Sequence, residues 1–139
     1  MIKFNEIFAY KRPYSSDSEK INGIKNFHYT FKSPSKKLIL LEKGISNPAK
    51  INAIDGDRYP FISLLTTPNK FYSIDTPWAD VLNIHDSSLI YFGDNKDKNR
   101  AAISSRGNKL LNNIYEIKDL TLIPPLLVFE KNTYNGKAK

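Results

Sequence analysis

Cysteine is absent from this chain of 139 residues, and histidine occurs only twice, at His28 and His85. Without cysteine the protein has neither disulfide bonds nor thiolate metal sites, which fits a cytoplasmic protein. The two histidines lie far apart in the sequence and form no HxH or HxxxH pair, so each is interpreted as a loop or partly buried residue. We therefore expect no metal site and no other cofactor.

Long apolar runs are also missing. No stretch of about 18 consecutive apolar residues occurs, so we expect no membrane-spanning segment. The first residues, MIKFNEIFAYKRP, contain charged side chains within their apolar part and no small-residue cleavage site, so no signal peptide is expected. The sequence has no GxGxxG, GxxxxGK[ST], GxSxG or HExxH motif. Nucleotide sites and nucleophilic or zinc hydrolase sites of these types are therefore not indicated.

Acidic residues are fewer than basic ones, at 14 against 21, and the formal net charge is +7. Such an excess favours polyanionic partners, either nucleic acid or an anionic membrane surface. A similar excess also occurs in proteomes rich in Lys and Asn without any functional reason. Charge alone therefore does not select the partner.

Hydrophobic residues make up 40% of the chain and aromatic residues 12%, which is sufficient for a core. We predict a single domain over residues 1–139, because this length is too short for two comfortable domains. Residues 1–10 are typical of a strand or short helix, and Asp55-Gly56 is typical of a hairpin turn. Alternating or continuous apolar patterns predict further strands at 27–32, 38–42, 87–94 and 121–131, the last at an edge or bulge because of its prolines.

One amphipathic helix is predicted over residues 108–120, where Leu110, Ile114 and Ile117 share a face. Ser105 or Asn108 is the expected N-cap. Short strands at roughly regular spacing with one clear helix predict a mainly β (α+β) fold, either a barrel or a sandwich. Strands and helices do not alternate, so no Rossmann unit is expected.

The densest basic feature follows the predicted strand at 87–94. Cations alternate there with amide and hydroxyl side chains, a mixture that contacts phosphates and base edges. Backbone N–H groups of residues 106–108, before the helix, are candidates for holding a phosphate. The alternative is a solvated loop that serves only solubility. The candidate DNA-binding residues are Lys11, Arg12 and Tyr14; Lys36 and Lys37; and Asn95, Lys96, Lys98, Asn99, Arg100, Arg106, Asn108 and Lys109.

Three residues near this loop are candidates for reading a base. Trp78, the only tryptophan, is either a core anchor or a stacking surface for a base. Asp80 and Asp94 are carboxylates able to accept a hydrogen bond from the cytosine amino group. For Asp94 the alternative is ordinary turn chemistry within Gly-Asp-Asn.

A small metal-dependent nuclease is an alternative function. Glu116-Ile117-Lys118 matches the short half of a PD-(D/E)xK motif, with Asp94 upstream. Glu116, however, falls at the end of the predicted helix and not on a strand, so we expect no catalytic residues. A module that binds RNA or another protein is a further alternative.

Between residues 76 and 130 the motifs TPWxD, IYFGDNK, RGNKLL and PPLLVF follow one another. In this order they resemble the N-terminal domain of AspBHI-type, modification-dependent restriction endonucleases. The chain departs from the family pattern at residues 86–88, where Asp-Ser-Ser stands in place of a glycine. The residues that carry the resemblance are Thr76, Pro77, Trp78, Asp80, Tyr91, Gly93–Lys96, Gly107–Leu111 and Pro124–Phe129.

The resemblance implies an SRA-like, seven-stranded pseudobarrel with one or two flanking helices. It implies that a modified cytosine is flipped into a pocket, near which Trp78, Asp80, Tyr91 and Asp94 would lie. Related restriction enzymes use a pseudobarrel like that of plant B-type transcription factors, which reads an unmodified site with two arms. The family domain continues beyond the Pro-Pro strand, so we expect the chain to be the N-terminal part of a larger restriction protein.

The sequence thus predicts a non-catalytic, sequence-specific domain that binds double-stranded DNA in a restriction endonuclease. Flipping of a methylated cytosine and groove reading of an unmodified site both stay open. The expected partners are duplex DNA and a nuclease or motor domain or subunit of the same restriction system.

Overall fold

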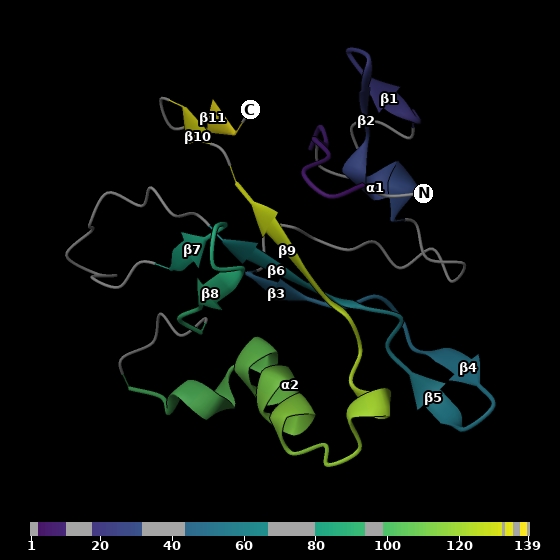
Figure 1. The fold of residues 1–139 in the computed structure, drawn as a ribbon, viewed down its shortest axis with the longest axis vertical. Coiled ribbons are helices and arrows are strands. Elements are labelled where there is room, and N and C mark those ends of the chain that lie inside the picture. Colours follow the sequence, from purple (N-terminus) through teal and green to yellow (C-terminus); the bar gives the residue numbers. More distant parts are fainter. Residues whose placement is uncertain are drawn as a thin grey trace.

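The computed structural model describes residues 3–10, 18–31, 44–66, 80–93 and 99–131, together with the backbone of 133–134 and 137–138. At its centre lies a three-stranded sheet in the order β3 (Ile45–Ser46), β6 (Ile62–Thr66), β9 (Leu126–Glu130) (Figure 1). Strand β6 runs antiparallel to β3 and parallel to β9, with Ile62 opposite Leu126 and Thr66 opposite Glu130. Strands far apart in the sequence thus form the core.

Strand β6 is enclosed on both faces, as is typical of a central strand with a parallel neighbour. Ile62 and Leu64 face one cluster, which includes Ile45 and Ile114. Phe61 and Leu65 face a second, aromatic cluster around Phe27 and Phe31. The period-two alternation of a strand therefore distributes successive side chains of one segment between two cores.

Four two-stranded hairpins surround this sheet in the described residues. Asn22 and Gly23 have φ angles of 49° and 81°, as a tight turn with two left-handed residues requires. The hairpin predicted at Asp55-Gly56 is confirmed, and Gly56 has a φ of 115°. The hairpins are β1 (Lys20–Ile21) with β2 (Ile24–Lys25), β4 (Ile51–Ala53) with β5 (Gly56–Arg58), β7 (Val81–Asn83) with β8 (Ser88–Ile90), and β10 (Thr133–Tyr134) with β11 (Lys137–Ala138).

The strand predicted at 27–32 is wrong: residues Phe27–Thr30 form the short helix α1. Asn26 caps this helix by accepting a hydrogen bond from the backbone N–H of His28 at 3.2 Å. Phe27 and Phe31 are four residues apart, so the helix brings both rings to one side, with centroids 4.6 Å apart. Packing of these rings against Phe129 on β9 selects the helix over the alternating pattern.

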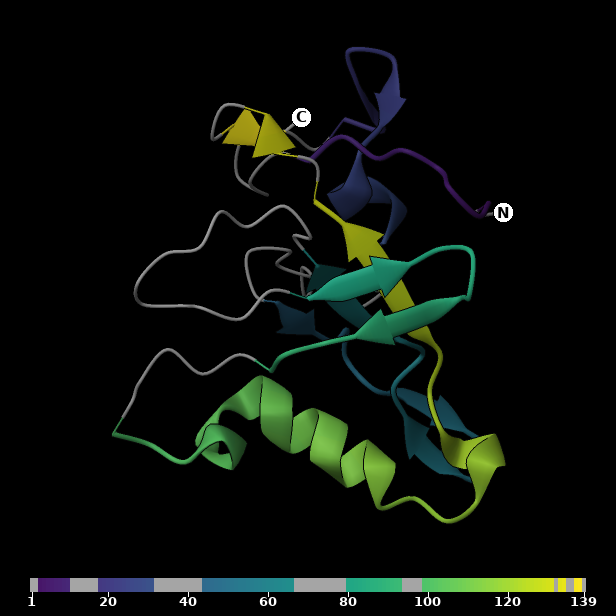
Figure 2. The same ribbon diagram turned by 60° about the vertical axis from the view of Figure 1, so that its left-hand side comes forward.

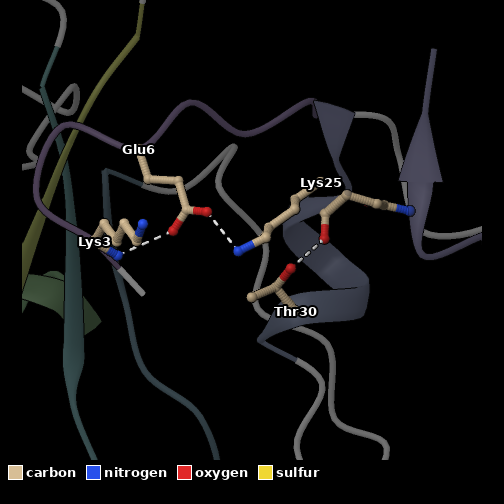
Figure 3. Close-up of polar contacts among 5 residues, drawn as sticks. Lys3, Glu6, Lys25 and Thr30 are labelled. Carbon is tan, nitrogen blue, oxygen red and sulfur yellow. Dashed lines mark hydrogen bonds and ion pairs between the residues drawn. The ribbon is translucent and has the colours of Figure 1, made fainter. Parts of the chain in front are cut away.

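Polar contacts join the N-terminal segment to Lys25 on β2, next to α1 (Figure 3). Glu6 accepts hydrogen bonds from the Lys25 ammonium at 2.5 Å and from the Lys3 backbone N–H at 3.0 Å. These bonds, with Lys25 first, hold the pKa of the Glu6 carboxyl below its ordinary value. Residues 1–10, predicted as a strand or short helix, contain in their described part only an isolated bridge from Ala9 to Asn26.

The amphipathic helix is confirmed as α2, which spans Arg106–Tyr115. Ser105 is its N-cap and accepts from the backbone N–H of Asn108 at 3.2 Å, whereas Asn108 lies within the helix. The predicted end at residue 120 is wrong, because the chain leaves the helix after Tyr115 and forms a 3-10 turn, η3 (Leu120–Leu122). Helix α2 lies along the face of the sheet opposite α1.

The strand predicted at 87–94 is confirmed in its centre as β8. The strand predicted at 121–131 is confirmed in its second part as β9, whereas its first two residues lie in η3. Pro124 and Pro125 come before β9, so their missing N–H groups do not interrupt its pairing with β6, and β9 is an edge strand in the described part of the sheet. The strand predicted at 38–42 lies outside the described residues. The mainly β (α+β) fold with few helices is confirmed. None of the helices described here is long and apolar enough to span a membrane.

Candidate nucleic-acid interface

The structure describes seven of the candidate site residues: Asp80, Tyr91, Asn99, Arg100, Arg106, Asn108 and Lys109. They come from the β7–β8 hairpin and from the segment that leads into α2. The other candidates lie outside the described residues: Lys11, Arg12, Tyr14, Lys36, Lys37, Trp78, Asp94, Asn95, Lys96 and Lys98.

The start of α2 forms a basic surface. Arg100, Arg106 and Lys109 are all exposed, and residues 99–115 contain no Asp or Glu. Arg106 and Lys109 are three residues apart in the helix, so their side chains are neighbours on one face. The positive end of the helix dipole lies at the same place and adds to the attraction for an anion. We name Arg100, Arg106 and Lys109 the basic end of α2.

The side chain of Asn108 connects the start of α2 to two neighbouring segments. Its Nδ2 donates to the carbonyl of Ala102 at 2.8 Å, within the 3-10 turn η2 (Ala102–Ser104). Its side chain also lies directly against Gly93, where a Cβ atom would collide with the amide group. Only glycine leaves room for this approach. The backbone N–H of Asn108 donates to the Ser105 hydroxyl. Of the N–H groups of residues 106–108 that were candidates for holding a phosphate, this one therefore already has a partner within the protein.

Gly107 sets the distance between α2 and the sheet. A Cβ atom on Gly107 would lie 2.8 Å from the Cβ of Ile45 on β3. The helix therefore approaches β3 more closely than any other residue type would permit. This packing, together with the buried side chain of Ile114, fixes the position of the basic end relative to the sheet.

Asp80 connects two strand ends. Its Oδ2 accepts from the hydroxyl of Thr66 at 3.0 Å, and its Oδ1 accepts from the backbone N–H of Phe92 at 2.9 Å. Thr66 ends β6 and is completely buried, whereas Phe92 follows β8. One carboxylate thus joins the central strand to the β7–β8 hairpin and is itself held in a fixed orientation.

Tyr91 lies on the core side of the same strand. It packs with the apolar cluster of Ile45 and Ile114. Its hydroxyl oxygen lies 2.6 Å from the position that a Cβ atom would take on Gly44, just before β3. The ring therefore occupies the gap between the β7–β8 hairpin and the sheet.

Three candidate residues distant in sequence thus meet where the chain leaves β8. Asp80 binds Phe92, Asn108 lies against Gly93, and Tyr91 precedes both. We name Tyr91–Gly93 with Asp80 and Asn108 the β8 exit. In the ribbon diagram the β7–β8 hairpin lies above the α2 segment, with the basic start of the helix below the β8 exit (Figure 2).

The sequence analysis did not select Thr66 or Gly44. It included Gly93 and Gly107 among the residues that carry the family resemblance, but it did not predict that other residues pack closely against them. A glycine that follows a strong strand, and another next to a helix cap, are signals for close backbone approach. The partner of Asp80 has no such signal, because Thr66 resembles any other strand threonine until the sheet is assembled.

The alternative nuclease motif is not assembled on a strand. Glu116 terminates α2, is exposed, and accepts from Nδ2 of Asn112 at 3.0 Å. Lys118 is exposed in the turn that follows. Within the described ranges, no group of three or more His, Asp or Glu side chains is placed to hold a metal ion.

Comparison with known proteins identifies the class of this domain. Residues 25–139 match the family described as "Restriction endonuclease AspBHI N-terminal". The chain is therefore an N-terminal domain of the restriction endonuclease type and belongs to the AspBHI N-terminal family, as the sequence motifs predicted. No curated protein sequence matches the chain.

A solved structure, the MspJI restriction endonuclease in complex with a 27-mer oligonucleotide, has a similar fold. The TM-score is 0.68 and the sequence identity is 26%, over 94% of this chain and 32% of that chain. The present chain thus spans about a third of the length of its structural relative. The likeness agrees with the mainly β fold, and with the family match it supports a DNA-binding role in a restriction enzyme.

Proposed function

We propose that this chain is the sequence-specific, double-stranded-DNA-binding domain of a restriction endonuclease, and that it is itself non-catalytic. The family match carries this proposal. The basic end of α2 agrees with it, because three exposed cations lie in a segment without acidic residues. We further propose that the domain acts in the cytoplasm together with a nuclease or motor part of the same restriction system.

Affinity comes mainly from phosphate contacts. Arg106 and Lys109 lie on one turn of a rigid helix, and Arg100 lies in the segment before it. Cations in this arrangement bind successive phosphates of the DNA backbone and displace condensed counterions, so DNA binding weakens steeply as the salt concentration rises. Lys96 and Lys98, which lie outside the described residues, are further candidates for phosphate contacts.

Specificity comes from the β8 exit and the segments that leave it. We propose that a methylated cytosine is flipped out of the duplex and read there, with Trp78 and Tyr91 as aromatic candidates and Asp80 and Asp94 as polar candidates. Flipping requires groups held in fixed positions, so that the unstacking cost of a few kcal/mol is offset by binding. The two hydrogen bonds that orient Asp80 support this role, either as a reader or as a support for the readers.

Groove reading of an unmodified site is the second candidate, and the β7–β8 hairpin favours it. The turn between these strands exposes Ile84, His85 and Asp86, so the hairpin has the form of a short arm. A two-stranded ribbon fits into the major groove of duplex DNA. In this case the unmethylated motif binds, and methylation of a cytosine that the hairpin contacts places a methyl group in the same groove, which weakens binding or leaves it unchanged.

The test is a titration with duplex DNA at two salt concentrations, using matched random-sequence pools with and without cytosine methylation. Enrichment from the methylated pool supports flipping, and enrichment of one motif from both pools or from the unmethylated pool alone supports groove reading. Arg106→Gln and Lys109→Gln each lower the slope of log K against log salt by about 0.9, if each removes one phosphate contact. Lys118→Gln, beyond the other end of α2, is the matched control. Absence of binding in both pools would refute the DNA-binding function.

A further inference from the structure

The side chain of Asn108 is the point at which three described segments meet. Asn108 itself lies on α2, and its Nδ2 donates to the carbonyl of Ala102 in the turn η2 at 2.8 Å. Its amide group also lies directly against Gly93, where the three heavy atoms nearest to the position of a Cβ atom all belong to that amide. One half-buried side chain therefore contacts the β8 exit and η2 from a place on α2.

A second side chain holds the β8 exit from the sheet. Asp80 accepts from the backbone N–H of Phe92 at 2.9 Å, and the buried hydroxyl of Thr66 on β6 orients the Asp80 carboxylate. Asp80 and Asn108 thus hold two consecutive residues, Phe92 and Gly93. A candidate base reader and the start of the basic helix are therefore joined through a single peptide unit.

Base reading depends on this connection more strongly than phosphate binding does. The attraction between a cation and a phosphate decreases only gradually with distance, so small displacements of the basic end of α2 are tolerated. A hydrogen bond to a base edge has a narrow range of lengths and angles, and the groups that form it must be held to within about 0.5 Å. Phosphate contacts place the DNA backbone, and base contacts supply the sequence information. Specificity therefore requires a fixed distance between the two surfaces.

We propose that Asn108 is a positioning residue for specificity. It holds η2 and the basic end of α2 at a fixed distance from the β8 exit, so that phosphate contacts bring the DNA into register with the base-reading groups. The inference rests on the proposed function and adds to it a residue that acts without touching a base. Nδ2 of Asn108 has a partner within the protein, which favours this role over direct contact with DNA.

The first measurement is made without DNA and uses the absence of cysteine from the chain. Ser88→Cys on β8 and Ser104→Cys in η2 replace exposed serines and carry two spin labels, whose separation is measured by pulsed electron paramagnetic resonance. We expect one narrow distance distribution, which becomes at least twice as wide after Asn108→Ala. The matched control is Asn112→Ala, which removes the same side chain one turn further along α2, where it donates to Glu116, and should leave the distribution unchanged.

Gly93→Ala disturbs the same contact from its other partner. The added methyl group collides with the amide of Asn108, so this variant should also widen the distribution. In the Asn108→Ala background the collision is absent, and Gly93→Ala should add nothing further. If Asn108→Ala does not fold, Gly93→Ala supplies the same test.

The second measurement compares DNA affinity for the motif selected by the wild-type chain with affinity for random-sequence duplexes. This ratio should fall at least tenfold in Asn108→Ala and in Gly93→Ala, and should not change in Asn112→Ala. The slope of log K against log salt should stay the same, because no cation is lost.

The outcomes separate this proposal from the proposed function. An unchanged distance distribution in Asn108→Ala would overturn the positioning role, and if the preference for the motif were nevertheless lost, Asn108 would be assigned to direct contact with DNA. Equal losses of affinity for the motif and for random-sequence DNA would overturn it as well. Absence of DNA binding by the wild-type chain would refute the proposed function, and with it this role, even where the distances change as expected.

Discussion

Replacing Asp80 with alanine removes the acceptor of two hydrogen bonds that join β6 to the β8 exit. The first bond is donated by the hydroxyl of Thr66, which is completely buried. Loss of a hydrogen bond to a charged acceptor costs about 1.5–3 kcal/mol. The bond from Phe92 N–H lies at the surface, where water replaces the acceptor, so its loss adds about 0.5–1 kcal/mol. We expect Asp80→Ala to lower the free energy of unfolding by about 3 kcal/mol, or the melting temperature by roughly 10 °C.

Urea unfolding followed by circular dichroism measures this loss, and a double-mutant cycle assigns it. Thr66→Val removes the buried hydroxyl with little change of shape. If the Asp80–Thr66 bond is the cause, the two changes combine with a coupling energy of about 1–2 kcal/mol. A loss below about 0.5 kcal/mol for Asp80→Ala, or a coupling energy near zero, would refute the reasoning.

Asp80→Asn distinguishes a role of Asp80 in supporting the β8 exit from a role in reading a base. The amide retains an oxygen for Phe92 N–H and places an NH₂ group toward Thr66, so stability should fall by only about 1 kcal/mol. If Asp80 only supports the β8 exit, affinity falls equally for all DNA sequences. If Asp80 accepts from the cytosine amino group, the preference at one base position changes. Selection from a random-sequence pool with both proteins distinguishes the two results.

Three further changes test the packing and the polar contacts. Gly107→Ala should lower the free energy of unfolding by about 1–2 kcal/mol in urea titrations, because the new methyl group collides with Ile45; a gain of stability would show that the helix shifts freely. Glu6→Gln should lower the melting temperature at about pH 7 but not at about pH 2. The bond from Lys25 lowers the pKa of the Glu6 carboxyl below its ordinary value of 4.5. The stabilisation that Glu6 gives the folded state is therefore present above pH 4.5 and is lost as the pH falls through the folded-state pKa. An equal difference at both pH values would contradict this assignment. Ser87→Gly should raise the free energy of unfolding by about 0.5–1 kcal/mol, because Ser87 has a φ of 50°, and a lower value would indicate a side-chain contact in the turn.

Features of the fold that depend on local sequence were predictable. Leu110 and Ile114 mark one face of α2, and Ser105 marks its start, because both patterns lie within a few turns of one helix. Ile117, predicted on the same face, lies beyond the end of the helix. The hairpin at Asp55-Gly56 is equally local. Asn22-Gly23 carries the same kind of turn signal, and the sequence analysis did not use it.

The error at residues 27–32 has a non-local cause. Alternating aromatic and β-branched residues favour a strand, but Phe27 and Phe31 also have helical spacing. Their partners Phe8 and Phe129 come from opposite ends of the chain, and no local pattern contains them. Tertiary packing therefore decides between two patterns that the local sequence permits equally.

The sequence predicted several candidate site residues, whose roles stay predictions, but it did not predict the contacts between them. The motif analysis selected Asp80, Tyr91 and Asn108, which the fold brings to the β8 exit. Asp80 accepts hydrogen bonds from Thr66, 14 residues before it, and from Phe92, 12 residues after it, so these bonds form only when β6 and the hairpin are in place. The roles of Trp78 and Asp94, which lie outside the described residues, stay predictions.

The parallel pairing of β6 with β9 has a consequence for the order of events during synthesis. Ile62 leaves the ribosome well before its partner Leu126, and at about 5–20 residues per second the interval is on the order of ten seconds. During this interval the apolar strand β6 lacks the neighbour that covers its edge, which makes it a point of association for other chains. The basic end of α2, the proposed DNA-binding surface, is also translated before the sheet that supports it can close. A nascent copy of this domain therefore acquires this proposed surface in one late step, when β9 is added.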